Sequence, residues 1–370
     1  MHPAGAEQES QEPQNQPERV GDLLELDEIH VQFAPDLVSM ALDPATGLDA
    51  RILSMREHIA RGFGLILPEI RLTDRDDLPT GTYSIQIQGV EHARDHLETD
   101  ALLLLKSGDE SGFPAGQDVA EPVYGAPARW ISPRDRDAAV VTGATVVTPG
   151  EVLATHLLET LKKNLSRLLS FKALQRHLDA FTDLSDPTRS EANRRMLNDL
   201  VPEKVPMDIL HSILRLLLAE QVSIRNLPLI LEAIAEVRPA LTGPDLICEH
   251  VRQRLGFQLV SDLKRDDGTV PLVQLAGQWE DIFKKHEVPS EGGIPEIALT
   301  PDLFNALARA VGDKISSAAE KGTYAAVVTS SLRRRFLRTV LLSRGILNPV
   351  LSFEEIGLEA KPSLVGVAAP

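Results

Sequence analysis

Residues 216–236, LLLAEQVSIRNLPLILEAIAE, decide how the middle of the chain folds. Apolar side chains recur there every three or four positions, which is typical of amphipathic helices. The pattern predicts two helices joined by a short turn, with Ile224 and Leu227 filling the space between them. Outward from this stretch the helical pattern continues over segments near 171–182, 189–200, 206–220 and 226–237. Because no strand pattern intervenes, we expect a compact helical subdomain over residues 169–241.

The pattern changes after residue 242, where helical and strand-like segments alternate. Helices are expected at 244–255, 300–319 and 331–343, and strands at 257–260, 270–275, 324–329 and 346–353. Such alternation is typical of a sheet with helices on both faces. Residues 242–356 are therefore predicted to form a three-layer α/β subdomain, and residues 357–370 a C-terminal tail.

The first part of the chain predicts a different arrangement. Strand patterns occur at 26–33, 37–42, 65–72 and 83–89, around a helical pattern over 48–61. This order predicts an α+β, thioredoxin-like module made of residues 23–100 and 148–168. Its last helix begins at Thr148, because a threonine followed three residues later by Glu151 can form a capping box.

Two stretches are set apart from this module by their composition. Residues 101–147 contain many Gly, Pro and Asp and short strand patterns at 101–106, 138–141 and 145–147, so they predict a small inserted α+β subdomain. Residues 1–22 carry few large apolar side chains and many Gln, Glu and Pro, a composition typical of a disordered linker. The fold class expected for the whole chain is therefore multidomain, part α+β and part α/β.

Charge and cysteine content exclude several classes of protein. The chain has 38 Lys and Arg against 54 Asp and Glu, a net charge of −16, which opposes binding to nucleic acid. Cys248 is the single cysteine, so an intramolecular disulfide and a cysteine-based zinc site are excluded, and we expect a buried or half-buried thiol. No run of 18 apolar residues occurs, so no membrane-spanning helix is predicted.

Motifs of common enzyme classes are missing from the sequence. There is no GxxxxGK[ST] loop, GxGxxG turn, HExxH or GxSxG motif. We therefore expect no cofactor, no metal and no enzymatic activity. A thioredoxin-like oxidoreductase is the alternative from a different class, but the sequence has no CxxC motif and Cys248 lies outside the first module.

Three histidines could carry chemistry and are interpreted as structural. His92 and His96 are four residues apart, as a metal pair on a helix would be, but they directly follow a strand pattern among charged residues. A surface turn is the favoured interpretation. His156 lies beside an apolar stripe without a nucleophile nearby in sequence, so a hydrogen-bonded structural role is expected.

Four arginines, Arg333, Arg334, Arg335 and Arg338, form a basic run next to apolar residues at helical spacing. Such a run is usually the solvated face of an amphipathic helix, which is the interpretation we favour. Contact with an acidic face of a neighbouring copy of the chain is the alternative.

Four stretches carry a resemblance to a known family. They are 121–131 EPVYGAPARWI, 146–157 VVTPGEVLATHL, 216–236 as quoted above, and 325–338 AAVVTSSLRRRFLR. Together they resemble the FHIPEP family, the type III secretion export-gate proteins, over residues 26–356 and in the same order. The segment 121–131 is similar to the one found in flagellar members, whereas a virulence injectisome is the alternative within the family.

The resemblance implies the cytoplasmic half of an export gate, at the cytoplasmic face of the bacterial inner membrane, without the membrane half. It implies a ring, usually of nine copies, below the export channel. Its implied partners are flagellar export chaperones with bound filament-type substrates and other export apparatus proteins, namely the ATPase complex and switch or gate proteins.

The resemblance also implies a docking cleft between the first two subdomains. Flagellar members use an acidic residue, an aromatic residue and a threonine there, which correspond to Glu121, Tyr124 and Thr155. The family pattern has Asp and Phe at the first two positions, and the added hydroxyl of Tyr124 needs solvent or a partner. The alternative is that Tyr124 packs the insertion, Glu121 is solvated and Thr155 bonds back to its own helix.

Overall fold

The computed structural model describes residues 25–44, 46–106, 112–289, 296–357 and 360–370. The described residues form two compact units, one made of those up to residue 54 and within 68–160, and the other of those within 55–67 and from 161 onward. Helices α2 (Leu48–Phe63) and α4 (Pro149–Lys163) each begin in the first unit and end in the second. The mixed α and β composition predicted for a multidomain chain is confirmed.

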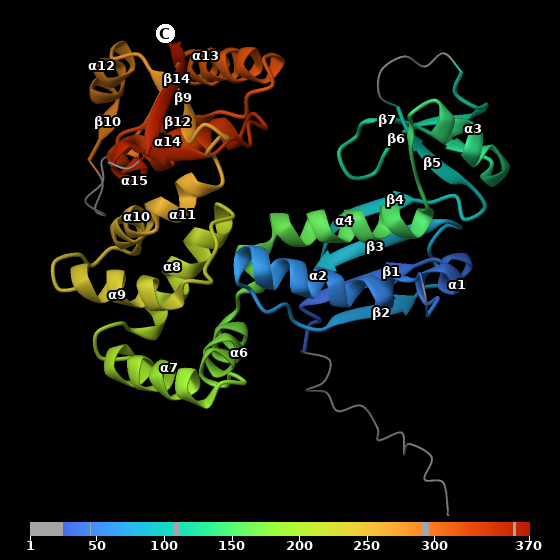
Figure 1. The fold of residues 1–370 in the computed structure, drawn as a ribbon, viewed down its shortest axis with the longest axis horizontal. Helices are drawn as coiled ribbons and strands as arrows, with labels where there is room; N and C mark the ends of the chain where they lie inside the picture. Colours follow the sequence, from blue (N-terminus) through green and yellow to red (C-terminus); the bar gives the residue numbers. More distant parts are fainter. Residues whose placement is uncertain (1–24, 45, 107–111, 290–295, 358–359) are drawn as a thin grey trace, which may run out of the picture. The chain divides into compact units, whose positions relative to one another are not determined.

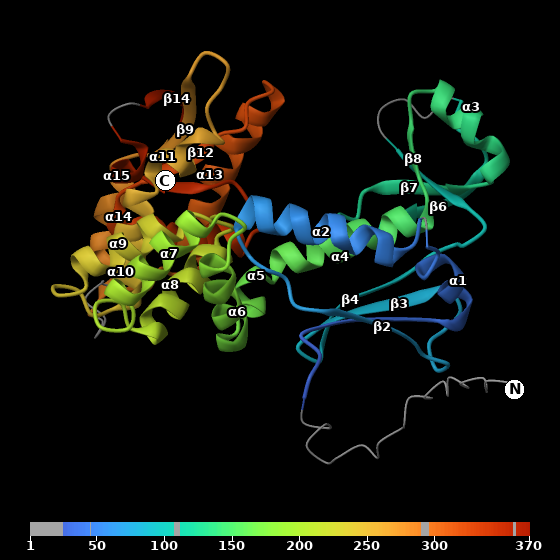
Figure 2. The ribbon, with the colours of Figure 1, turned by 60° about the horizontal axis from the view of Figure 1, so that its bottom comes forward.

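The first unit contains a four-stranded sheet that supports two long helices. Its strands are β1 (Ile29–Phe33), β2 (Ile70–Asp74), β3 (Thr82–Ile87) and β4 (Val90–His96), in the order β2-β1-β3-β4. Strands β1 and β2 are parallel and the other pairs are antiparallel. Figure 2 shows α2 and α4 on one face of this sheet. Helix α4 begins with the predicted capping box, in which Thr148 and Glu151 exchange hydrogen bonds.

A second sheet in the same unit is built from the inserted residues. Its strands are β5 (Leu102–Leu105), β6 (Gly116–Ala120), β7 (Pro127–Ile131) and β8 (Thr145–Val147), antiparallel and in the order β6-β7-β5-β8. The 3-10 turn η3 (Pro133–Asp135) and helix α3 (Arg136–Val141) connect β7 to β8. Leu104, Ile131, Ala139 and Ala144 form a small buried core between this sheet and helix α3. The β6–β7 loop, residues 121–126, carries two of the predicted site residues.

Three local predictions in the first unit are wrong. The expected strand at 37–42 is helical, in η2 (Pro35–Leu37) and α1 (Val38–Ala41), because Leu37 and Ala41 reach the core at helical spacing. The expected strand at 138–141 is helix α3, where only Ala139 is buried and Val141 is 87% exposed. His92 and His96 lie in strand β4 and not in a turn.

The first part of the second unit after α4 is helical and follows the sequence pattern closely. Its helices are α5 (Leu165–Leu168), α6 (Phe171–Thr182), α7 (Pro187–Leu200), α8 (Met207–Ala219), α9 (Leu227–Val237) and α10 (Pro244–Arg254). Ile224 and Leu227, the residues expected between α8 and α9, are 0% and 1% exposed. The Ile224 amide also donates to the carbonyl of Phe63, which ties this turn to the end of α2.

The last part of the second unit is a parallel sheet with helices on both faces (Figure 1). The strands are β9 (Thr269–Leu275), β12 (Ala326–Thr329), β13 (Val350–Ser352) and β14 (Lys361–Ala368), in the order β13-β12-β9-β14. Helices α12 (Gln278–Lys285), α13 (Pro301–Glu320) and α14 (Ser331–Leu342) pack on one core. Helices α11 (Gly256–Ser261) and α15 (Phe353–Ile356) border the other, and β10 (Glu287–Val288) pairs with β11 (Glu296–Ile297).

Two predictions in this part are wrong. Residues 257–260, expected as a strand, lie in helix α11. Val260 of this helix contributes to the core. The helix begins at Gly256, where a Cβ atom would clash with the carbonyl of Glu355. Residues 357–370, expected as a tail, include strand β14, which pairs with β9 at the edge of the sheet. An edge strand tolerates Pro362 and the bulge between Leu364 and Gly366, which break the usual strand pattern.

The basic run on α14 is largely buried, so the solvated face expected from the sequence is wrong for its first two arginines. Arg333 and Arg334 are 1% and 0% exposed. Arg333 bonds to Glu280 and Glu287. Arg334 bonds to Glu220, at the end of α8, and to Glu249, on α10. These buried cations are matched by glutamates from distant parts of the sequence, which is the condition for burying a charge.

Candidate functional site

The Glu121 carboxylate organises the β6–β7 loop from inside. It accepts hydrogen bonds from the amides of Val123 (2.8 Å), Tyr124 (2.6 Å) and Ala126 (3.2 Å), and the residue is 6% exposed. Backbone bonds between Glu121 and Ala126 and from Gly125 to Glu121 close the same loop. The sequence suggested either a docking carboxylate or a solvated one. The structure places the carboxylate inward, with its oxygens occupied by the loop that carries Tyr124.

Tyr124 projects from this loop into solvent. Its side chain is 70% exposed, one of the most exposed large apolar residues of the first unit. The loop turns sharply at the next residue, Gly125, whose φ of +71° favours glycine. The alternative in which Tyr124 packs the insertion therefore does not describe the structure.

Helix α4 supplies the residues beside Tyr124. Partial burial, then the charge of Glu159 and a hydrogen bond to it, raise the pKa of the Tyr124 hydroxyl. The hydroxyl that distinguishes Tyr124 from the family's phenylalanine thus has a partner on α4. Thr155 lies one helical turn before Glu159, so both share a face of the helix. Glu159 was not singled out from the sequence, although its spacing of four from Thr155 would have indicated it.

The Thr155 hydroxyl is bound within its own helix. It donates to the carbonyl of Glu151 at 2.8 Å while the residue remains exposed. This back-bonding is common for threonine in helices. The lone pairs of the oxygen remain able to accept a hydrogen bond from a partner.

A buried hydrogen bond fixes α4 beneath this surface. The Tyr83 hydroxyl on β3 and Nδ1 of His156 are 2.6 Å apart, and the two rings meet edge to face. Burial, followed by the charges of Asp95 and Glu121, raises the pKa of Tyr83. The structural role predicted for His156 is confirmed, and this contact holds the register of α4 on the sheet.

The surface at Tyr124 presents the exposed ring of Tyr124, the hydroxyls of Tyr124 and Thr155 and the carboxylate of Glu159. Among these residues no nucleophile is paired with a base. Among the described residues, no group of three His, Cys, Asp or Glu side chains could hold a metal ion. The described helices also include none with the length and apolarity needed to cross a membrane. Cys248 is buried, as expected, and lies in α10 of the other unit.

A comparison with known families decides the affiliation. A match to the FHIPEP family covers residues 2–361. The chain belongs to the FHIPEP family. The resemblance carried by the four sequence stretches is thereby confirmed.

Individual FHIPEP relatives agree with the flagellar resemblance. The chain is 30% identical to the flagellar biosynthesis protein FlhA of Caulobacter vibrioides over 358 residues, which is 96% of this chain and 49% of that protein. It thus spans about half the length of the curated relatives it matches, as it also does for FlhA of Bacillus subtilis.

Solved structures share the fold of this FHIPEP chain. The Chlamydia pneumoniae CdsV protein aligns with a TM-score of 0.77 and 20% identity, covering 93% of this chain and 98% of CdsV. The nonameric EPEC SctV-C aligns with a TM-score of 0.71 and 15% identity, covering 92% and 98%.

Proposed function

We propose that the chain is the cytoplasmic half of a type III export-gate protein of the flagellar kind, and that it docks export chaperones with bound filament-type substrates. Family membership and the flagellar relatives support this proposal. The observation that carries it is Tyr124, a 70% exposed aromatic side chain on a loop tied down by the buried Glu121 carboxylate. On this proposal the protein is a binding platform and not an enzyme.

A fixed, exposed ring favours binding for two physical reasons. Aromatic side chains dominate binding hot spots because they bury a large area with few rotatable bonds. Three amide hydrogen bonds to Glu121 set the loop before a partner arrives, which reduces the ordering cost of association. Tyr124 is therefore the anchor of the proposed site.

The other two predicted residues have more specific roles in this proposal. Glu121 positions the loop and does not touch the partner, since its oxygens are engaged with amides of its own loop. Thr155 and Glu159 extend the surface along one face of α4. Glu159 replaces Glu121 as the carboxylate beside the ring, where it orients a partner more than it adds affinity.

The family also suggests an architecture and an assembly. We propose four subdomains, namely 23–100 with 148–168, then 101–147, then 169–241, and a last one from 242 that β14 extends to residue 368. The fold shared with a nonameric protein supports a ring, proposed as nine copies at the cytoplasmic face of the inner membrane. Further partners on this proposal are the ATPase complex and the switch or gate proteins of the export apparatus.

A virulence injectisome is the second candidate system. The two solved proteins compared above share the fold at 15–20% identity. The flagellar relative is 30% identical over nearly the whole chain, and the 121–131 segment resembles flagellar members, so we favour the flagellar system.

The test is calorimetric titration of the chain with a chaperone–filament-protein complex from the same organism. We expect a micromolar dissociation constant, which corresponds to a binding free energy of about −8 kcal/mol. Absence of binding to the flagellar complex, with binding of an injectisome chaperone–effector complex, would favour the second candidate. Absence of binding to both would contradict docking by this chain.

A further inference from the structure

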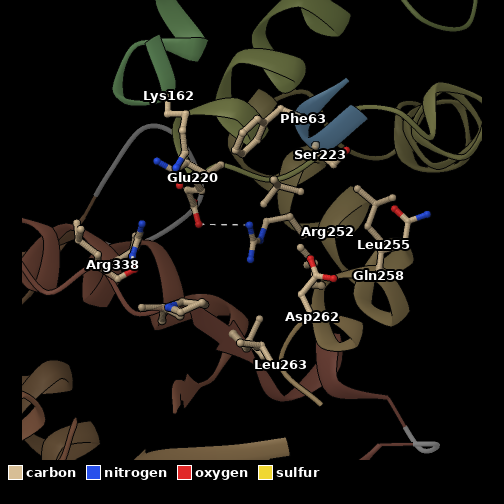
Figure 3. Close-up of a pocket in the computed structure, with 18 of the residues that line it drawn as sticks. Phe63, Lys162, Glu220, Ser223, Arg252, Leu255, Gln258, Asp262, Leu263 and Arg338 are labelled. Carbon is tan, nitrogen blue, oxygen red and sulfur yellow. Dashed lines mark hydrogen bonds and ion pairs between the residues drawn. The ribbon is translucent and has the colours of Figure 1, made fainter. Parts of the chain in front are cut away.

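A pocket lies in the second unit, and none of the residues proposed for docking lines it. Its volume is about 460 Å³, within the range of small-molecule sites. The end of α2, the α8–α9 turn, helices α10, α11 and α14, and strand β13 contribute to its wall (Figure 3). Both charged side chains and leucine and valine side chains line the pocket.

Arg252 is the most buried charged group of the pocket wall, at 3% exposure. Its Nε donates to Oε1 of Glu355 at 2.6 Å. Its Nη1 lies 3.3 Å from Oε2 of Glu220, the contact drawn in Figure 3, but makes no hydrogen bond to a described residue. Arg252 thus retains donor capacity at a site where unused donors are costly.

Arg338, on α14, is the second cation of the wall. Its Nη1 donates to the carbonyls of Leu347 and Asn348, and its Nε has no hydrogen-bond partner among the described residues. Loss of hydration on burial lowers the pKa of Arg338, although the nearby charge of Glu220 acts in the opposite direction. In the described part of the chain no carboxylate lies within ion-pair distance of Arg338, in contrast to Arg333 and Arg334.

Arg252 is paired with Glu355 and Glu220, whereas Arg338 has no paired carboxylate among the described residues. Glu220 is held through both oxygens by Arg334, which itself does not line the pocket. Asp262 is exposed at the rim. Arg338 is therefore a cation on the pocket wall without an ion pair to a described carboxylate, in a chain whose net charge is −16.

We propose that this pocket binds a small amphipathic carboxylate, with its carboxylate on Arg338 and Arg252 and its apolar body against α11 and β13. Leu259, Leu263, Val350 and Leu351 supply the apolar surface. Arginine favours a carboxylate because its planar donors match two oxygens at once. A single negative charge fits better than a phosphate dianion, since Glu220 and Asp262 would repel a second charge.

The probe pair is hexanoate and hexanamide, which have nearly the same shape but differ in charge. With leucine and valine methyl groups labelled for NMR, hexanoate should shift Leu259, Leu263, Val350 and Leu351 saturably, with a dissociation constant on the order of 1 mM for so small a ligand. Hexanamide should bind at least tenfold more weakly.

Two substitutions that should change hexanoate affinity in opposite directions make the test specific. Arg338→Gln should weaken hexanoate binding at least tenfold, and Asp262→Asn should strengthen it about threefold by removing a repelling charge. Arg344→Gln, outside this pocket, is the matched control and should change nothing. If Arg338→Gln perturbs the folded spectrum, Gln258→Glu places a carboxylate on the wall instead and should also abolish binding.

Two results would overturn the proposal. One is binding of hexanamide as strong as that of hexanoate, because the arginines would then have no part in recognition. The other is an unchanged affinity for hexanoate. If Asp262→Asn, Arg338→Gln and Gln258→Glu each change the dissociation constant by less than about twofold, roughly 0.4 kcal/mol, the charged wall does not bind the carboxylate.

Discussion

Replacing Arg334 with alanine should destabilise the second unit by about 3–5 kcal/mol, the usual result of breaking a buried ion pair. Arg334 is 0% exposed and bonds to Glu249 at 2.7 Å and Glu220 at 2.5 and 2.9 Å. Its loss leaves Glu249, with a side chain only 8% exposed, without its cation. Glu220 keeps Arg252 at 3.3 Å, so most of the effect comes from Glu249.

The neighbouring residue on the same helix is a matched control. Arg335 pairs with Asp245, and the two side chains are 37% and 49% exposed. Because exposed pairs contribute about 0–1 kcal/mol, Arg335→Ala should change the stability by no more than that. The two substitutions remove the same side chain from adjacent positions and differ in burial.

Urea unfolding followed by tryptophan fluorescence can isolate the relevant unit. The chain has two tryptophans, Trp130 in the first unit and Trp279 in the second. In a Trp130→Phe background the fluorescence comes from Trp279 alone and reports the unfolding of the second unit. The two-state assumption then applies to that unit and not to the whole chain. A loss below about 1 kcal/mol for Arg334→Ala, equal to that of Arg335→Ala, would refute the assignment of a stabilising buried network.

Three further predictions follow from single residues. Burial raises the pKa of Cys248 to about 12, so a thiol reagent at pH 8 should label it only as the second unit unfolds in urea, and rapid labelling of the folded chain would contradict its burial. Burial lowers the pKa of His177 below 6.5, so the unfolded state takes up the proton first and stability should fall as the pH decreases below about 6.5. His177→Gln should reduce that fall in urea midpoint between pH 7.5 and 5.5, and an unchanged fall would exclude His177 as its source. Glu121→Ala should speed hydrogen exchange of the amides in residues 121–126 and weaken chaperone docking, whereas unchanged exchange would show that the carboxylate does not hold the loop.

Long periodic segments were predictable from the sequence because their pattern spans several helical turns. The segments near 171–182 and 226–237 correspond to α6 and α9 with little change in their ends. Short segments were not predictable in this way. Residues 138–141 and 257–260 are only four residues long, so the apolar composition of a short helix and of a strand is the same.

The buried arginines could not be predicted from local pattern, because their partners are distant in sequence. Arg334 and Glu220 are 114 residues apart, and Arg334 and Glu249 are 85 apart. A basic run next to apolar residues indicates a solvated face unless the fold supplies such partners. The strand β14 was missed for a related reason, since its pairing with β9 alone makes residues 361–368 part of the sheet.

The family resemblance predicted Glu121, Tyr124 and Thr155 as site residues, but not how each side chain is placed. The structure shows that Tyr124 is exposed, whereas the site itself stays a prediction. Its hydroxyl partner, Glu159, is determined by how the β6–β7 loop lies beside α4. The inward orientation of Glu121 depends on the backbone of a six-residue loop, which the sequence alone does not specify.

Comparison of Tyr124→Ala with Tyr324→Ala in the chaperone–filament-protein titration tests the central claim most directly. Both tyrosines are exposed, at 70% and 60%, but Tyr324 lies in the second unit. Tyr124→Ala should weaken binding at least tenfold, about 1.4 kcal/mol, while Tyr324→Ala should leave it unchanged. Tyr124→Phe, which keeps the ring and loses the bond to Glu159, should bind within about threefold of the native chain. Equal affinities of the native chain and Tyr124→Ala would contradict docking at this loop.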